Sequence, residues 1–121
     1  MSLPAPYLVV VEDVIVGMDI ADAIASVLPE AEVLRCRDAV EALRIMGPHR
    51  DISRAFVEAD PVGFAGSPLA HDIARRGGHV VLLCDFADGG GASQDVDILL
   101  TPFGAGDIRR YLQKEAEKGG T

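Results

Sequence analysis

Two adjacent acids, Glu12 and Asp13, directly follow an apolar run that begins at Tyr7. The run reads YLVVV and comes after Pro6, a pattern typical of a strand that is buried on both faces of a sheet. Ligands of open parallel sheets gather outside the carboxyl ends of the strands, so these carboxylates could hold a hard cation. The alternative is that the two acids are solvated at a strand end and favour the helix that follows.

The elements that would position this acidic pair alternate along the chain. Four more apolar runs predict strands, at 31–36 (AEVLRC), 52–59 (ISRAFVEA), 79–85 (HVVLLCD) and 96–101 (VDILLT). Helical spacing of apolar residues follows the first strand from Val16 to Val27, and Pro29 ends that helix.

Capping residues place the remaining helices. Asp38 with Glu41 forms a capping box for a second helix, Ser67 with Pro68 at the first position begins a third, and Asp107 is expected to cap the last. The second helix is expected to bury a stripe made of Val40, Leu43 and Ile45 or Met46.

Glycine marks two segments as irregular. Asp60-Pro61 with Gly63 and Gly66 predicts a loop, and the three glycines within 87–95 predict a loop or one turn in place of a full fourth helix.

Alternating strands and helices predict an α/β fold with a parallel sheet and helices on both faces. The expected strand order is 2-1-3-4-5, which is the flavodoxin-like (βα)5 three-layer sandwich, here with its fourth helix shortened or missing. The chain of 121 residues is expected to form one domain, 1–121, with its core at about 7–116.

Composition excludes several classes of function. The net charge is -8, from 19 acids and 11 bases, which argues against direct nucleic-acid binding. No apolar run is long enough to span a membrane and no signal peptide pattern is present, so a cytoplasmic protein is expected. Cys36 and Cys84 lie far apart in apolar runs and are expected to be buried thiols.

Three motifs in register, VVVED (9–13), LLCDFAD (82–88) and LLTPF (99–103), resemble the receiver domain of two-component response regulators. The resemblance covers about 7–116. It implies a protein in which two acids hold Mg²⁺ while an aspartate on the third strand accepts a phosphoryl group from a histidine kinase. A threonine or serine on the fourth strand and a lysine on the fifth would then stabilise that group.

The functional positions of that family are only partly retained here. Glu12 and Asp13 match the metal-binding acids, and the phosphoacceptor position falls on Glu58, with Asp60 as the alternative if the register differs. The resemblance makes Glu58 a third candidate Mg²⁺ ligand. The remaining positions have changed type: Cys84 stands for the threonine, Thr101 for the lysine and Ile98 for the aromatic switch residue.

These changes predict a degenerate receiver, or pseudo-receiver, that is not an enzyme. We expect it to act by docking to a histidine kinase or other signalling protein, or as a homodimer through the face formed by the fourth helix, fifth strand and fifth helix. One alternative is a conventional phosphoacceptor receiver working with altered residues. Another is a flavodoxin-type FMN-binding protein, although the sequence EDVIVG after the first strand would repel phosphate.

Overall fold

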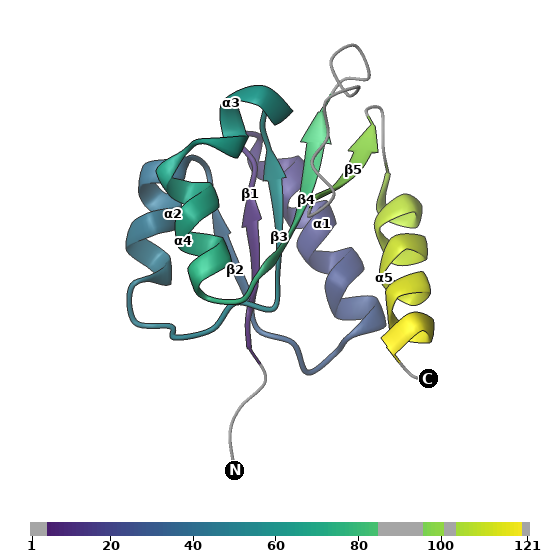
Figure 1. Cartoon of the computed structure of the whole chain (residues 1–121). Coiled ribbons are helices and arrows are strands. Elements are labelled where there is room, and N and C mark those ends of the chain that lie inside the picture. Colours follow the sequence, from purple (N-terminus) through teal and green to yellow (C-terminus); the bar gives the residue numbers. More distant parts are fainter. Residues whose placement is uncertain (1–4, 85–95, 101–103, 120–121) are drawn as a thin grey trace.

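The computed structural model describes residues 5–84, 96–100 and 104–119. Five parallel strands form one sheet in the order β2-β1-β3-β4-β5, which confirms the expected flavodoxin-like topology. Figure 1 shows α2 and α4 covering one face of the sheet and α1 and α5 covering the other. The strands are β1 (Tyr7–Val10), β2 (Val33–Cys36), β3 (Arg54–Glu58), β4 (His79–Cys84) and β5 (Val96–Leu100).

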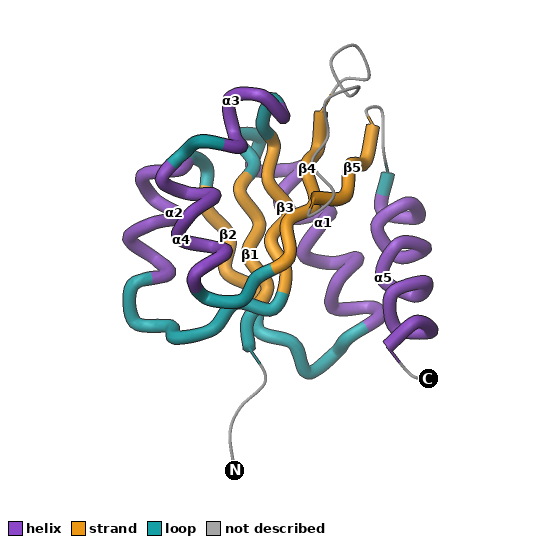
Figure 2. Tube along the Cα trace, viewed as in Figure 1, coloured by secondary structure: helices purple, strands orange, loops and turns teal. Residues whose placement is uncertain are grey.

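Helices follow most of these strands, as Figure 2 shows. They are α1 (Val14–Val27), α2 (Ala39–Met46), α3 (Pro61–Ala65), α4 (Pro68–Arg75) and α5 (Ala105–Gly119). The segment 87–95, expected to lack a full helix, lies outside the described residues. Within the described part of the chain, no helix combines the length and apolarity needed to cross a membrane.

Burial of the strands on both faces explains why they read as continuous apolar runs. In β1, Leu8 and Val10 pack on the α2 and α4 side, whereas Val9 packs on the α1 and α5 side. In β3, Val57 and Phe56 divide in the same way, and both are at most 2% exposed. Successive side chains of a strand point to opposite faces, so each strand contributes to both core layers.

Most of the expected helix starts are confirmed. Asp38 accepts a hydrogen bond from the Glu41 N–H at 2.9 Å, and the Glu41 carboxylate accepts one from the Arg37 N–H at 3.0 Å. Ser67 Oγ accepts from the Ala70 N–H at 3.2 Å at the start of α4. These bonds satisfy backbone donors that have no partner inside the helix.

The structure corrects three expectations about helices. Asp107 is not the N-cap of α5, because the helix begins at Ala105, and its carboxylate instead accepts from the Gly104 N–H at 2.8 Å. The segment after Asp60 is not an irregular loop, because Asp60 caps the short helix α3. Val40 is 80% exposed, so the buried positions of α2 are Ala42 and Met46.

Candidate functional site

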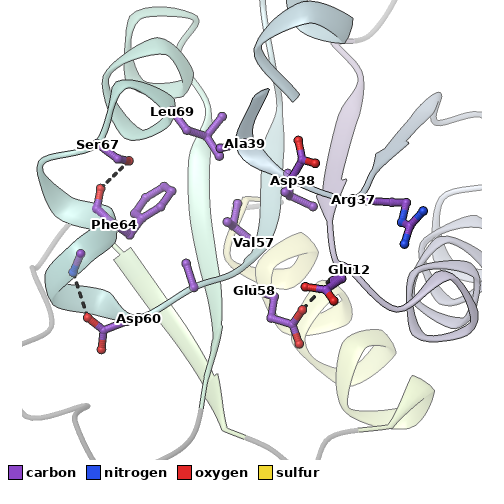
Figure 3. Close-up of a pocket in the computed structure, with 13 residues that line it drawn as sticks. Glu12, Arg37, Asp38, Ala39, Val57, Glu58, Asp60, Phe64, Ser67 and Leu69 are labelled. Carbon is purple, nitrogen blue, oxygen red and sulfur yellow. Dashed lines mark hydrogen bonds between the residues drawn. The ribbon is translucent and has the colours of Figure 1, made fainter. Parts of the chain in front are cut away.

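The register of β1 and β3 brings Glu12 and Glu58 together at the carboxyl edge of the sheet. Val10 pairs with Val57, so Glu12 lies just beyond the end of β1 beside Glu58, the last residue of β3. The Glu12 N–H donates a hydrogen bond to Glu58 Oε1 at 3.3 Å (Figure 3). Both residues are exposed, so the Glu58 carboxylate points away from the sheet interior and into solvent.

Asp13, the other acid of the predicted pair, has a different task in the structure. Its Oδ1 accepts hydrogen bonds from the Ile15 N–H at 2.9 Å and the Val16 N–H at 3.2 Å, so Asp13 is the N-cap of α1. This is the helix-favouring alternative that the sequence left open. The adjacent acids therefore separate: Glu12 lines a cavity with Glu58, while Asp13 caps a helix.

The cavity beside Glu58 has a volume of about 380 Å³ and a predominantly acidic rim. The described residues that line it include the acids Glu12, Asp38, Glu58 and Asp60 and a single base, Arg37. Figure 3 shows these side chains around the cavity. Its apolar wall is formed by Val57, Phe64 and Leu69 with neighbouring residues.

This charge distribution decides which ligands the cavity could favour. Three of its carboxylates are already held by backbone donors: Asp38 by the Glu41 N–H and Asp60 by the Gly63 N–H, each at 2.9 Å, and Glu58 by the Glu12 N–H at 3.3 Å. An excess of negative charge opposes an incoming phosphoryl group, because like charges in a partly desolvated site repel each other. The cavity is therefore better suited to cationic groups than to phosphate.

The three predicted metal ligands do not form one coordination set in the structure. Across the described residues, no three His, Cys, Asp or Glu side chains are grouped as a metal ion would need. The donor geometry gives the reason, since one Asp13 oxygen is engaged by the first turn of α1 and Glu58 is paired with a backbone N–H. The residues present fit Mg²⁺ poorly, and metal binding by Glu12, Asp13 and Glu58 stays a prediction.

Two of the other three predicted positions, Cys84 and Ile98, lie among the described residues. Cys84 is half-buried at the end of β4, one residue beyond Leu83, the β4 partner of Glu58. Ile98 pairs with Leu82 and packs against the core layer on the α2 and α4 side. Thr101 lies outside the described residues, so the structure does not place the lysine position.

A polar network that the sequence did not reveal lies near the amino-terminal ends of β4 and β5. Asp97 Oδ2 accepts a 2.6 Å hydrogen bond from the Tyr111 hydroxyl and lies 2.9 Å from His79 Nε2. Burial opposes ionisation of Asp97, but hydrogen bonds from Tyr111 and His79 outweigh it, and the pKa of Asp97 is lowered. The Arg54 guanidinium lies 5.4 Å from the centre of the Tyr111 ring.

Burial and a hydrogen bond raise the pKa of Tyr111, although the Arg54 charge acts in the opposite direction. Burial is the larger cause and the hydrogen bond to Asp97 is the second, so the phenol stays protonated and acts as a donor. Residues of β4, β5 and α5 meet in this network, which explains why sequence spacing could not show it.

Cys36 is a buried structural thiol, as expected. It is 5% exposed, and its Sγ lies 3.5 Å from the Val9 carbonyl oxygen. Burial, with smaller contributions from Glu41 and Asp38, raises the pKa of the Cys36 thiol to about 12. Because the reactive form of cysteine is the thiolate, Cys36 is unsuited to nucleophilic chemistry.

In fold, the chain is similar to the receiver domains of response regulators. Two solved structures carry this similarity, each with a TM-score of 0.65. One is the solution structure of SdrG from Sphingomonas melonis Fr1, which is 22% identical, with 93% of this chain and 97% of that chain covered. The other is the crystal structure of a response regulator receiver modulated diguanylate cyclase from Pelobacter carbinolicus, which is 17% identical, with 95% and 94% covered.

At these identities the two structures show a shared fold and nothing finer. No protein-family model matches the sequence, and a comparison with curated proteins finds no significant match. The receiver-like architecture is thus established by structure, and the roles of individual residues rest on the site itself.

Proposed function

We propose that this chain is a receiver-like domain of two-component (phosphorelay) signalling that acts by binding another protein. In this proposal it is not phosphorylated in the usual way and catalyses no reaction of its own. The receiver-like fold supports the signalling class. The glutamate at position 58 and the threonine at position 101, where the resemblance places aspartate and lysine, support the absence of ordinary phosphotransfer.

The observation that carries the proposal is the position and hydrogen bonding of Glu58. It ends β3, where the resemblance places the phosphoacceptor, and its Oε1 accepts the Glu12 N–H at 3.3 Å. A glutamate oxygen lies about 1 Å further out than that of aspartate, enough to disturb in-line attack on phosphorus. With threonine at position 101 in place of lysine, one fixed cation is also missing, which typically costs a few kcal/mol in the transition state.

A permanent carboxylate at this position could hold the domain in one signalling state. Glu58 extends negative charge further from the strand than aspartate would, and thereby partly imitates a phosphorylated side chain. The proposed partner is a histidine kinase or another signalling protein. The other proposed partner is a second copy of the chain, bound through the face that includes β5 and α5.

The alternative proposal is a conventional phosphoacceptor receiver that uses altered residues. One observation favours it: the Glu58 carboxylate is exposed to solvent, within hydrogen-bond distance of the segment that carries Glu12. Magnesium distinguishes the two proposals, because phosphoryl transfer at a carboxylate depends on a metal to neutralise charge.

Magnesium titration followed by amide NMR tests the proposal. We expect only weak shifts at Glu12 and Glu58 that do not saturate at millimolar Mg²⁺, because the described carboxylates of this edge do not form a three-ligand set. The control is Asp22→Asn, which removes an exposed acid elsewhere on α1. Tight, saturable binding that Glu12→Gln abolishes and Asp22→Asn leaves intact would favour the phosphoacceptor alternative.

A further inference from the structure

A second cavity lies at the amino edge of the sheet, opposite the acidic one. Its volume is about 350 Å³, and it opens where α2 and α4 end. None of the described residues that line it is acidic, although the chain as a whole carries 19 acids and 11 bases. The lining residues are Gly47, Pro48, His49, Arg50, Arg75 and Arg76.

Two turns of the chain bring Arg50 close to Arg75 and Arg76, which are far from it in the sequence. Gly77 has a φ of 76°, a left-handed conformation that glycine adopts readily, and it turns the chain from α4 toward β4. The Ile52 N–H donates to the Arg76 carbonyl at 3.0 Å, which joins the loop after α2 to the end of α4. Arg50 and Arg75 therefore line the same cavity.

Hydrogen bonds of Asp72 and Arg76 hold the side chains around the cavity in place. Asp72 accepts from Arg75 Nη2 at 2.5 Å and from Arg76 Nε at 3.2 Å, and Arg76 Nη1 also donates to the His49 carbonyl. Arg76 is the more enclosed of the two arginines, with 13% of its side chain exposed, compared with 74% for Arg75. Arg76 is thus a positioning residue, and Arg75 still presents donors to solvent.

Arg50 has hydrogen-bond donors that no other described residue accepts. It is exposed, it lines the cavity, and it makes no hydrogen bond or ion pair with another described residue. A guanidinium offers five donors in a planar fork that matches the oxygens of phosphate. Arg50 and Arg75 could therefore both bind one anion in this cavity, and the ion pair with Asp72 holds Arg75 in place.

We propose that this arginine-lined cavity, formed by 47–50 and 75–76, binds the phosphate group of a small phosphorylated ligand. Its volume is at the lower end of the range for small-molecule sites, and the described lining residues include no Phe, Tyr or Trp. The ends of α2 and α4 carry partial negative charge, which opposes an anion, and the contact from Arg76 to the His49 carbonyl offsets part of it. This site is independent of the function proposed for the carboxyl edge.

Amide NMR of the full chain, titrated with inorganic phosphate and then glycerol 3-phosphate at constant ionic strength, tests the proposal. Saturable shifts are expected at 47–50 and 75–77, and they should weaken as salt is raised. Arg50→Gln and Arg75→Gln should each weaken binding by about tenfold, because each removes charge-assisted hydrogen bonds. Glu58→Gln should not change the affinity.

The matched control is Arg109→Gln, which removes the same charge from an exposed position on α5. Retained affinity in this variant, with loss in Arg50→Gln, would support a specific site. Shifts that do not saturate, shifts spread over the whole surface, or equal weakening by Arg109→Gln would overturn the proposal. The dispersion of each variant's spectrum shows whether it is folded.

Discussion

At the scale of single residues, Asp97 joins α5 to the sheet. One of its oxygens accepts the Tyr111 hydroxyl at 2.6 Å and lies 2.9 Å from His79 Nε2. Tyr111→Phe removes the first contact and leaves a partly buried carboxylate with one partner fewer. We expect the free energy of unfolding to fall by about 1 kcal/mol, measured by urea denaturation.

Tyr7→Phe is the matched control for Tyr111→Phe. Tyr7 packs against the core layer on the α1 and α5 side, and its hydroxyl makes no hydrogen bond with another described residue. The control should leave stability nearly unchanged. Equal effects of the two substitutions would contradict the role assigned to the Tyr111 hydroxyl.

Two aspartates should make the fold sensitive to acid. Hydrogen bonds from Arg75 and Arg76 lower the pKa of Asp72 despite its burial, and the pKa of Asp97 is lowered as well. Groups with a lowered folded-state pKa stabilise the fold above their unfolded value, here 3.8, and lose that contribution as pH falls through the folded-state pKa. The free energy of unfolding should therefore rise between about pH 2 and pH 5.

Urea denaturation across this pH range measures the effect. Asp72→Asn should reduce the rise in stability, because asparagine does not ionise and so has no charge for Arg75 and Arg76 to stabilise. Asp22→Asn, on the exposed side of α1, should leave most of the rise intact. A pH profile that Asp72→Asn does not alter would contradict the account of this ion pair.

The sequence predicted where the acidic side chains lie better than it predicted their hydrogen-bond partners. Five apolar residues before Glu12 were enough to place the two acids at a strand end, and counting placed Glu58 at the end of β3. The sequence could not decide between cation binding and helix capping for Asp13, because a carboxylate at this point is suited to both. It also could not show the Tyr111 and Asp97 contact, which depends on how α5 packs.

At the scale of elements, the turn between α4 and β4 depends on Gly78. A Cβ added there would lie 2.7 Å from Ile73 Cγ2 and 3.1 Å from Ile52 Cγ2, and both isoleucines are buried. Because β-branched side chains have little freedom to move aside, Gly78→Ala should lower the free energy of unfolding by about 2 kcal/mol.

Gly66→Ala provides the comparison for Gly78→Ala. Gly66 ends α3 with a negative φ, and a Cβ there would meet no atom within 4 Å. Its effect in the same denaturation experiment should be small. A destabilisation by Gly66→Ala as large as that by Gly78→Ala would contradict the explanation by contact with the two isoleucines, because Gly66 has room for a Cβ.

The sequence signals for elements were uneven in strength. Strand runs were clear because both faces are buried, whereas α3 was missed although Asp60-Pro61 is the same kind of start as Ser67-Pro68. Two glycines in PVGFAG outweighed that cap in the sequence interpretation. Helical spacing from Leu43 predicts that Val40 is buried, but Val40 is 80% exposed. Leu43 and Ile45 are themselves only partly buried, so apolar type alone does not mark the buried face of α2.

At the scale of the whole molecule, the cavities at the two ends of the strands have linings of opposite charge. Acids surround the cavity at the carboxyl edge, and arginines surround the cavity at the amino edge. Alternation of strands and helices predicted the strand order, and so the acidic edge, because parallel strands end together. It could not predict the arginine-lined cavity, since Arg50 and Arg75 belong to separate turns that meet only in the folded chain.

The central claim is that Glu58 occupies the acceptor position without accepting phosphate. The most direct test is intact-mass measurement after incubation with acetyl phosphate and Mg²⁺, comparing the natural chain with a Glu58→Asp/Thr101→Lys double variant that restores the two altered residue types. We predict that the natural chain gains no phosphoryl group and that any labelling appears in the double variant alone. A hydroxylamine-labile phosphoryl adduct on Glu58 of the natural chain would contradict the account.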